Sequence, residues 1–300
     1  MTRETPTVRY GVLPGSFDPL TVAHLDMACA AVRTASLDRV DLAISRSALG
    51  KEERMVTPII ERVAAIGRVA ATRPWLGVMV TEAQLLHDIA RGYDVVVMGA
   101  DKWLEINDAA WYQSAEERDR AIAALPRVLV APRQDLVVEG PELLDIDPTL
   151  TDVSSTAARA GAHDLIVPEA RRRIIVDGNN MIGTRPNGWW RDRAGATRKL
   201  VVALQQCARR TGARIAVVFD GNQLEDVPEG VHDGVLVAYA QRRGRDAADD
   251  RIVDEVAGDA EPSSLTVVTS DRVLSQRVRR LGAAIERPMR LADELDLDEQ

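Results

Sequence analysis

Residues 10–24 read Tyr-Gly-Val-Leu-Pro-Gly-Ser-Phe-Asp-Pro-Leu-Thr-Val-Ala-His, an apolar strand that runs into a turn and then into a helix beginning near Val22. Short apolar strands that alternate with helices are typical of parallel sheets buried on both faces. In such sheets a ligand binds beyond the carboxyl ends of the strands, where a helix N-terminus attracts phosphate. Gly15 lets the backbone approach that ligand closely. The stretch therefore predicts a phosphate-binding loop on an α/β fold.

A second stretch, residues 173–180, repeats this order as Arg-Ile-Ile-Val-Asp-Gly-Asn-Asn. The other apolar runs, separated by helical patterns such as 57–72 and 198–211, lie at residues 40–44, 76–80, 95–98, 128–130, 215–219, 235–239 and 265–269. The alternation breaks between residues 160 and 172, where Ala-Gly-Ala and Pro168 occur. We therefore predict an α/β fold with two tandem, three-layer, parallel-sheet domains, residues 1–168 and 169–300.

The composition is that of an ordinary globular protein, with 46% hydrophobic and 28% charged residues among 300. A chain of this length favours two domains over one. The two cysteines, Cys29 and Cys207, exclude a disulfide-built scaffold and a cysteine-based zinc site. No apolar run is long enough to span a bilayer, and the first residues contain no signal-peptide core. We expect a cytoplasmic protein without a membrane partner, and a homo-oligomer is compatible with these features.

The net charge of −8 arises from the first 170 residues, whereas residues 171–300 are neutral. An acidic first half argues against passive binding of nucleic acid there. The second half contains arginine clusters at 171–173, 242–245 and 277–280. Because lysine is nearly absent from the whole chain, a bias in genome composition is the simpler explanation of this arginine content.

Thr21 and His24 are three residues apart, so they share one face at the start of the first helix. A hydroxyl and an imidazole there can grip phosphate oxygens and stabilise the charge on a leaving pyrophosphate. A single histidine near a helix start is more often a cap or a surface group. The surrounding sequence therefore has to distinguish a functional histidine from a structural one.

Two separated motifs supply that context. Residues 15–24 and the Ser-Ser-Thr-Ala-Ala-Arg of residues 154–159 resemble the signatures of nucleotidyltransferases with an (H/T)xGH motif, such as the nicotinate-mononucleotide and phosphopantetheine adenylyltransferases of the cytidylyltransferase-like superfamily. The resemblance covers about residues 8–170 and implies a Rossmann-like domain. It also implies in-line attack of a substrate phosphate on the α-phosphorus of ATP, release of pyrophosphate, and Mg²⁺ bridging the phosphates. The acceptor that we expect is a phosphorylated small molecule such as nicotinate mononucleotide.

The same resemblance implies which residues act on the nucleotide. Thr21 and His24 would be catalytic and would hold the triphosphate. Further binding residues are implied in both motifs and in two loops: Gly15, Ser16, Phe17, Lys51, Asp101, Ser155, Thr156 and Arg159. A solvated loop lysine is an equally good interpretation of Lys51. Trp103 and Trp111 either stack on a pyridine ring of the acceptor or simply pack a helix.

The chain departs from this family at Ala23, where the family usually has glycine. Glycine lets the nucleotide base approach the backbone, so Ala23 is expected to loosen or alter nucleotide binding. A second hypothesis follows, in which the domain is a nucleotide-binding sensor that regulates the second domain and transfers nothing. Release of pyrophosphate distinguishes the two hypotheses.

Three aspartates of the second half directly follow strands, Asp177, Asp220 and Asp271, and two more, Asp249 and Asp250, lie in a cluster that opens a helix. Because the carboxyl ends of parallel strands meet at one edge, we expect these carboxylates to lie together. Such a group repels itself unless a divalent cation neutralises it, and oxygen ligands suit Mg²⁺ or Mn²⁺. Bound metals can activate water for phosphodiester cleavage. Each aspartate taken alone is explained as well by a turn or a helix cap.

In combination, Asp-Gly-Asn-Asn, Phe-Asp-Gly, Ala-Asp-Asp and Thr-Ser-Asp resemble the NYN branch of the PIN-like ribonucleases, and within it the YacP-like group, over residues 172–295. The resemblance implies that Asp177, Asp271 and one of the neighbours Asp249 and Asp250 bind metal, with Asp220 supporting or joining them. Adjacent helical residues diverge by about 100°, so only one of these neighbours is expected to face the metal. The resemblance further implies that Asn180 supports the site and that Ser270 orients Asp271.

RNA cut endonucleolytically is the substrate that this second resemblance implies. The arginines of residues 242–245 are candidates to bind RNA phosphates. Trp189 and Trp190, next to Arg191 and Arg193, form an aromatic and basic patch that can stack an unpaired base. One buried and one partly exposed tryptophan is an equally good interpretation. The sequence thus predicts a bifunctional nucleotidyltransferase and metal-dependent ribonuclease, with a noncatalytic RNA-binding second domain as the alternative.

Overall fold

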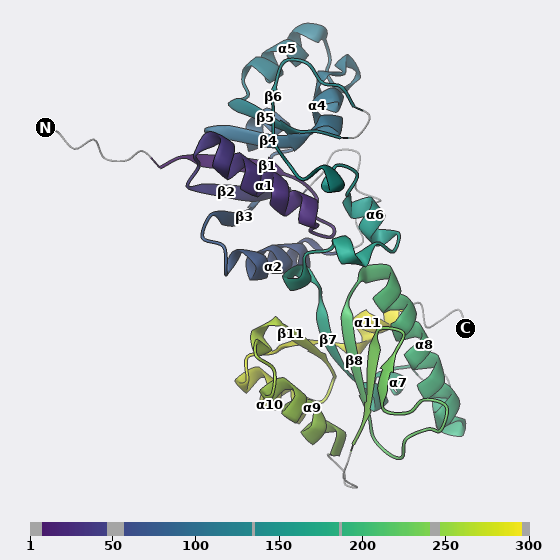
Figure 1. The fold of residues 1–300 in the computed structure, drawn as a ribbon. Helices are drawn as coiled ribbons and strands as arrows, with labels where there is room; N and C mark the ends of the chain where they lie inside the picture. Colours follow the sequence, from purple (N-terminus) through teal and green to yellow (C-terminus); the bar gives the residue numbers. More distant parts are fainter. Residues whose placement is uncertain (1–7, 47–56, 134–135, 186–187, 241–246, 296–300) are drawn as a thin grey trace, which may run out of the picture. The chain divides into compact units, whose positions relative to one another are not determined.

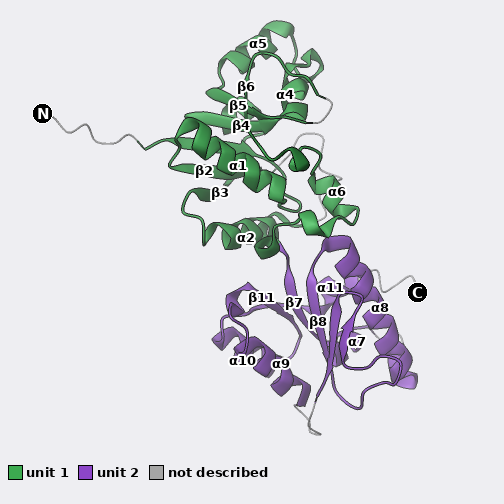
Figure 2. Ribbon diagram, in the orientation of Figure 1, with its two compact units in different colours: residues 1–170 green, residues 171–300 purple. Residues whose placement is uncertain are grey.

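The computed structural model describes residues 8–46, 57–133, 136–185, 188–240 and 247–295. The chain divides into two compact units, residues 1–170 and 171–300 (Figure 2). Each unit has a sheet and a hydrophobic core of its own. The boundary lies two residues after the one expected from the sequence pattern.

Unit 1 is built on a six-stranded sheet in the order β3-β2-β1-β4-β5-β6 (Figure 1). Its strands are β1 (Tyr10–Pro14), β2 (Arg39–Ser45), β3 (Leu76–Thr81), β4 (Val95–Gly99), β5 (Arg127–Ala131) and β6 (Glu142–Leu143). The pairings between them are parallel. The central strands are buried on both faces, as their unbroken apolar sequences require.

Helices cover both faces of this sheet. They are α1 (Val22–Ala35), α2 (Ile59–Ala70), α3 (Leu86–Ile89), α4 (Ala100–Asn107), α5 (Ala115–Ala123) and α6 (Ser155–Arg159). Leu13 of β1 packs into the core that contains Met27 of α1 and Ile66 of α2. Its neighbour Val12 packs into the opposite core, with Ile106 of α4. Alternate residues of β1 thus face the two helical layers, because successive side chains of a strand point to opposite faces.

Unit 2 repeats this architecture with the strand order β12-β11-β7-β8-β10-β9. Its strands are β7 (Arg173–Asp177), β8 (Arg214–Phe219), β9 (Gly230–His232), β10 (Val235–Tyr239), β11 (Leu265–Val268) and β12 (Ala284–Glu286). Within the described ranges, only β9 is antiparallel, and it pairs with β10 at the edge of the sheet. The remaining pairings are parallel.

The helices of unit 2 are α7 (Gly178–Ile182), α8 (Arg193–Thr211), α9 (Ala247–Ala257), α10 (Arg272–Arg280) and α11 (Pro288–Glu294). Met181 of α7, Leu204 of α8 and Leu291 of α11 share one core. Ile252 of α9 and Leu274 of α10 belong to the core on the opposite face. The unit is therefore a second three-layer α/β sandwich, with α9 and α10 together on one side (Figure 1).

In each unit the first strand lies in the middle of the sheet. The chain leaves β1 toward β2 and β3 and then returns on the other side as β4. In unit 2 it leaves β7 toward β8 and returns as β11. At such a reversal the neighbouring loops diverge and leave a crevice at the carboxyl ends of the strands. Both candidate sites lie at these positions.

The predicted fold class is confirmed, since both sheets are dominated by parallel strands between helical layers. The sequence pattern missed β6, β9 and β12, each only two or three residues long. Within the described part of the chain, no helix combines the length and apolar character that a membrane crossing requires.

Two candidate active sites

The loop after β1 is shaped by Phe17. This residue has a left-handed backbone with φ of 48°, and its buried ring meets the ring of His24 edge-on at 5.1 Å. A Cβ on Gly15 would lie 2.8 Å from the Phe17 ring, closer than such atoms approach. Glycine at position 15 is therefore needed for the turn itself. The predicted binding residues Gly15, Ser16 and Phe17 thus all lie in this turn.

The same loop is fixed from α2. Arg62 is buried and donates through its guanidinium to the carbonyl oxygens of Ser16 (2.6 Å) and Thr57 (3.0 Å). The buried carboxylate of Asp18 accepts a hydrogen bond from the Thr57 backbone N–H at 3.3 Å. Asp18 therefore links the loop after β1 to the residues just before α2. Arg62, which sequence reasoning missed, has a role that depends on contacts 46 positions away.

Thr21 and His24 lie together at the start of α1. The backbone N–H of Thr21 donates to His24 Nδ1 at 3.1 Å, and its Oγ1 lies 2.8 Å from the same nitrogen. Because Nδ1 accepts, the neutral imidazole carries its proton on Nε2. Burial and then the charge of Arg133 lower the pKa of His24 to about 4, against a smaller opposing effect of Asp101. At pH 7, His24 is thus a neutral hydrogen-bond donor.

Arg133 joins three loops at this edge of the sheet. Its guanidinium donates to the carbonyl oxygens of Thr151 (3.0 Å) and Val153 (2.9 Å), and its Nε lies 3.6 Å from the Asp101 carboxylate. Arg133 also acts on the pKa of His24, so its charge lies near the imidazole. Sequence reasoning missed this residue. An arginine two positions beyond β5 was the available signal, and its partners are backbone carbonyls that no motif reveals.

The second predicted motif is tied directly to the first. Ser155 Oγ donates to the Pro19 carbonyl oxygen at 2.8 Å, and Arg159 donates to the carbonyl oxygen of Asp18. A second guanidinium nitrogen of Arg159 lies 3.1 Å from Thr156 Oγ1. The structure therefore brings Ser155, Thr156 and Arg159 to the loop after β1. In this arrangement part of the arginine's hydrogen-bonding capacity is directed at protein backbone.

Other predicted residues of unit 1 lie around this edge. Asp101 is exposed in the first turn of α4 and approaches Arg133. Trp103 is half-buried beside the core under α4, whereas Trp111 is 53% exposed. Lys51 lies outside the described residues. Ala23 is buried, so its methyl group already fills space in the packing of α1.

In unit 2 the site is centred on Asp177, the last residue of β7 and the N-cap of α7. Its Oδ1 accepts the backbone N–H of Asn180 at 3.1 Å, and its Oδ2 accepts the hydroxyl of Thr269 at 2.9 Å. Burial raises the pKa of Asp177, and the nearby carboxylates of Asp220 and Asp271 raise it further, while the two hydrogen bonds oppose this. Asp220 and Asp271 therefore both lie close enough to Asp177 for their charges to act on it.

Asp220 and Asp271 both cap helices. Asp220 Oδ1 accepts the N–H of Ala248 at 3.1 Å, close to the start of α9. Asp271 Oδ1 accepts the N–H groups of Val273 (2.7 Å) and Leu274 (2.8 Å) at the start of α10. In the described part of the chain, the second oxygen of each carboxylate has no hydrogen bond. The helix caps therefore use one of the two oxygens of each carboxylate.

The five predicted acids do not form a single cluster. Asp250 is exposed and pairs with Arg277 of α10 at 2.7 Å, whereas Asp249 is half-buried in the same turn of α9. Among the residues described, no three His, Cys, Asp or Glu side chains form a ready-made metal site. Any cation here would need ligands beyond these side chains.

Ser270 has a different role from the expected one. Its backbone N–H and its hydroxyl both donate to Asn180 Oδ1, at 3.0 and 2.9 Å, and not to the Asp271 carboxylate. The neighbouring Thr269 contacts both acids instead, since its Oγ1 also accepts the Asp271 backbone N–H at 3.1 Å. Sequence reasoning assigned the wrong neighbour, because the direction of alternate side chains at a strand end depends on where the strand stops.

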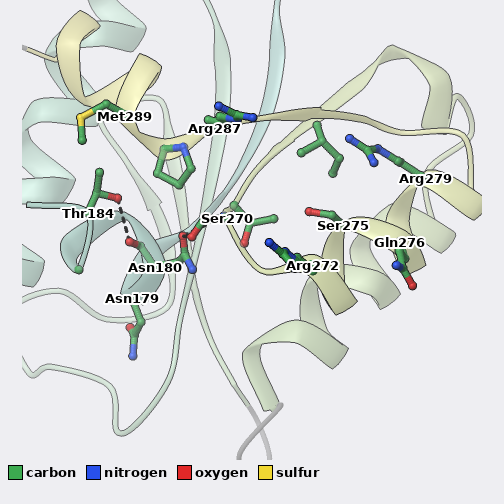
Figure 3. Close-up of a pocket in the computed structure, with 14 residues that line it drawn as sticks. Asn179, Asn180, Thr184, Ser270, Arg272, Ser275, Gln276, Arg279, Arg287 and Met289 are labelled. Carbon is green, nitrogen blue, oxygen red and sulfur yellow. Dashed lines mark hydrogen bonds between the residues drawn. The ribbon is translucent and has the colours of Figure 1, made fainter.

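A cleft of about 920 Å³ opens at the ends of these strands (Figure 3). It is lined by Asn179, Asn180, Gly183, Thr184, Thr269, Ser270, Arg272, Ser275, Gln276, Arg279, Ile285, Arg287, Pro288 and Met289. Apart from Ile285, which lies in β12, these residues follow β7, β11 and β12, so the cleft lies at the carboxyl edge where the strand order reverses. No carboxylate is among the lining residues described.

The predicted aromatic and basic patch has one tryptophan half-buried and one 54% exposed, Trp189 and Trp190 respectively. Their rings meet edge-on at 6.2 Å, and the Arg193 guanidinium lies 5.5 Å from the Trp189 ring centre. The arginines of residues 242–245 lie outside the described residues. The patch is thus formed, and its use in binding stays a prediction.

The chain thus contains two parallel α/β units. The first has a strand–loop–helix of the kind that binds phosphate, and the second has neighbouring carboxylates at its strand ends. Both arrangements are typical of proteins that act on nucleotides or nucleic acids. Residues 12–161 match the model of the cytidylyltransferase-like family, and residues 174–300 match that of the YacP-like NYN domain. The chain belongs to the cytidylyltransferase-like family and carries a YacP-like NYN domain after it. Together these matches support a nucleotidyltransferase joined to a ribonuclease.

Two crystal structures of Rae1 (YacP) from Bacillus subtilis, one of a mutant, are similar to part of the chain. Both are 24% identical over 42% of this chain. They are covered over 76% and 74% of their own length, with TM-scores of 0.34 and 0.33. No curated protein matches the sequence.

Proposed function

We propose that unit 1 transfers an adenylyl group from ATP to a phosphorylated small molecule such as nicotinate mononucleotide, with release of pyrophosphate. The neutral His24 at the start of α1 carries this proposal. Its Nε2–H can donate to a phosphate oxygen, and the adjacent Arg133 offers positive charge to the same region. ATP would bring Mg²⁺, whose charge offsets that of the triphosphate.

The residues of unit 1 would act by positioning. Transfer between phosphates needs no protein nucleophile, so the gain comes from alignment and from stabilising the charge on the leaving pyrophosphate. Thr21 fixes the His24 ring through Nδ1 and so aims Nε2. The first turn of α1 adds backbone N–H groups that favour an anion.

Pyrophosphate release tests this proposal. Wild type is expected to release pyrophosphate from ATP when the correct acceptor is added, and His24→Ala is expected to lose at least 100-fold in rate. His87, a half-buried histidine paired with Asp88 on α3, provides the matched control variant His87→Ala. No release with nicotinate mononucleotide or any common phosphorylated acceptor would contradict the transferase.

Two observations favour the sensor as a second candidate. Ala23 is buried where the family usually has glycine. Arg159 donates a hydrogen bond to the Asp18 carbonyl oxygen, so that N–H group is not directed at a phosphate. A site that binds ATP without catalysing transfer would fit both features. ATP binding measured by calorimetry, together with absent pyrophosphate release, would support the sensor.

We propose that unit 2 cleaves RNA with the help of a divalent cation. The buried Asp177, held at the end of β7 with the charges of Asp220 and Asp271 nearby, carries this proposal, because repulsion between carboxylates is relieved by a bound cation. Mg²⁺ commonly binds through one or two carboxylates, several waters and substrate phosphates. The unused oxygens of Asp220 and Asp271 fit such an incomplete protein shell. Of the adjacent pair, we propose that Asp249 faces the site, because Asp250 is paired with Arg277.

When bound, Mg²⁺ or Mn²⁺ would supply a water of lowered pKa and stabilise the leaving oxygen. The protein's part is to hold the carboxylates at the strand ends. Thr269 fixes Asp177 and receives the Asp271 backbone N–H, so one hydroxyl sets the relative position of two acids.

Cleavage of a labelled RNA with and without Mn²⁺ tests the ribonuclease. Wild type is expected to cut only with the metal, and Asp177→Asn is expected to be inactive. Asp254→Asn is the matched control, because Asp254 is an exposed acid on α9, one turn beyond Asp250. Metal-dependent cleavage that survives Asp177→Asn would overturn the proposed site.

A further inference from the structure

One face of α10 forms a wall of the cleft in unit 2. Arg272, Ser275, Gln276 and Arg279 all line it, with the spacing of three and four residues that places side chains on one helical face. Arg287, at the start of α11, approaches the cleft from a second element (Figure 3). Three guanidinium groups from two helices therefore surround one cavity.

The guanidinium groups of these three arginines are available to bind an anion. In the part of the chain that the structure describes, the guanidinium groups of Arg272, Arg279 and Arg287 form no hydrogen bond or ion pair, and all three residues are exposed. Arg277 lies on the same helix but pairs with Asp250. Unpaired guanidiniums around a cavity without carboxylates are complementary to an anion that carries several charges.

The remaining walls are neutral and of two kinds. Asn179, Ser275 and Gln276 offer amide and hydroxyl groups, which suit sugar hydroxyls and phosphate oxygens. Pro288 and Met289 form an apolar corner, and Met289 is 48% exposed. A ligand with repeated negative charges, hydroxyls and flat apolar rings matches all of these surfaces.

The cleft also adjoins the acidic site. Asn180 and Thr269 line it, and the same two residues donate to the carboxylate of Asp177. A ligand strand in the cleft would thus be separated from Asp177 only by Asn180 and Thr269.

We propose that this cleft is the groove for single-stranded RNA, with Arg272, Arg279 and Arg287 bound to successive phosphates. The inference rests on the proposed ribonuclease function and adds to it the path of the substrate. It places the strand along α10, from the carboxylates toward the start of α11.

Binding of a fluorescent single-stranded oligoribonucleotide to the full chain tests the groove. The measurement uses EDTA, so that cleavage does not interfere, and a series of salt concentrations. Replacing all three arginines by glutamine is expected to weaken binding at least tenfold and to reduce the salt slope by about 2, because each phosphate contact on a single strand contributes about 0.7. The variants Arg272→Gln, Arg279→Gln and Arg287→Gln are each expected to give part of this effect.

Arg280→Gln is the matched control, since Arg280 is exposed on the same helix but does not line the cleft. It is expected to leave affinity and slope unchanged, and all variants are expected to keep the wild-type melting temperature. Wild-type affinity and slope in the triple variant would overturn the groove, as would equal loss in Arg280→Gln or a preference for DNA of the same sequence.

Cleavage assays in Mn²⁺ separate this inference from the function on which it rests. RNA binding that depends on the three arginines, without any cleavage by wild type, contradicts the ribonuclease and supports the groove. Cleavage by wild type that persists at the same apparent KM in the triple variant supports the ribonuclease and contradicts the groove.

Discussion

At the scale of single residues, His24 makes the stability of unit 1 depend on pH. Its pKa of about 4 in the folded chain lies below the ordinary 6.5. As the pH falls below 6.5, the unfolded chain takes up a proton that the folded chain does not, so folding loses up to about 1.4 kcal/mol per pH unit until about pH 4. Hydrogen exchange of peptides from residues 10–35 measures this, with wild type losing more protection than His24→Gln between pH 7 and 5. Equal losses in both proteins would contradict the prediction.

Asp177 is expected to lower the stability of unit 2 while it serves the proposed metal site. Its pKa is raised, so the ionised carboxylate destabilises the fold at every pH above that pKa. Asp177→Asn removes this charge and keeps a side chain that can cap α7. We expect the melting temperature of unit 2 to rise or stay unchanged in Asp177→Asn, while the stabilisation by Mn²⁺ disappears. A fall of several degrees would show that the charge itself holds the site together.

The place of Asp177 at the end of β7 was predictable because it needs only an apolar run and the residue that follows it. The places of Thr21 and His24 at the start of α1 followed from their three-residue spacing and from the motif around them. Sequence reasoning could not find Arg62 or Arg133, whose partners are backbone carbonyls of distant loops. It also could not choose between Thr269 and Ser270, since that choice depends on which way the last strand residue points.

At the scale of elements, the short helix α6 acts as a clamp on the loop after β1. Ser155 and Arg159 bind the carbonyl oxygens of Pro19 and Asp18, which lie more than 130 positions earlier in the chain. Ser155→Ala removes one of these hydrogen bonds, worth about 1 kcal/mol. We expect ATP to bind about fivefold more weakly to Ser155→Ala, as measured by calorimetry. Thr149→Ala, on the loop before α6, is the control, and unchanged affinity in Ser155→Ala would argue against the clamp.

The long apolar strands were predictable because their composition alone marks them as buried on both faces. The short edge strands β6 and β9 were not, since Glu142–Leu143 and Gly230–His232 are too brief for any pattern. They form because a neighbouring strand already exposes a row of hydrogen-bonding groups.

At the scale of the whole molecule, each unit has its own core, and we expect each to fold alone. Residues 1–170 and 171–300, produced separately, should each give a cooperative melting transition. A ligand that binds only the folded state raises its melting temperature, so ATP should shift the first unit and Mn²⁺ the second. Aggregation of either half, with a normal transition in the full chain, would contradict the independence of the units.

The hydrogen bond between Thr269 and Asp177 spans 92 positions of the chain. Ribosomes release a chain from its N-terminus, and domains fold as their residues emerge. Strand β7 is therefore synthesised long before β11, although the two lie side by side in the sheet. Until β11 and the residues after it have been synthesised, the proposed ribonuclease lacks Asp271 and the Thr269 hydroxyl that fixes Asp177. The proposed nuclease site is therefore completed only after most of unit 2 has been synthesised.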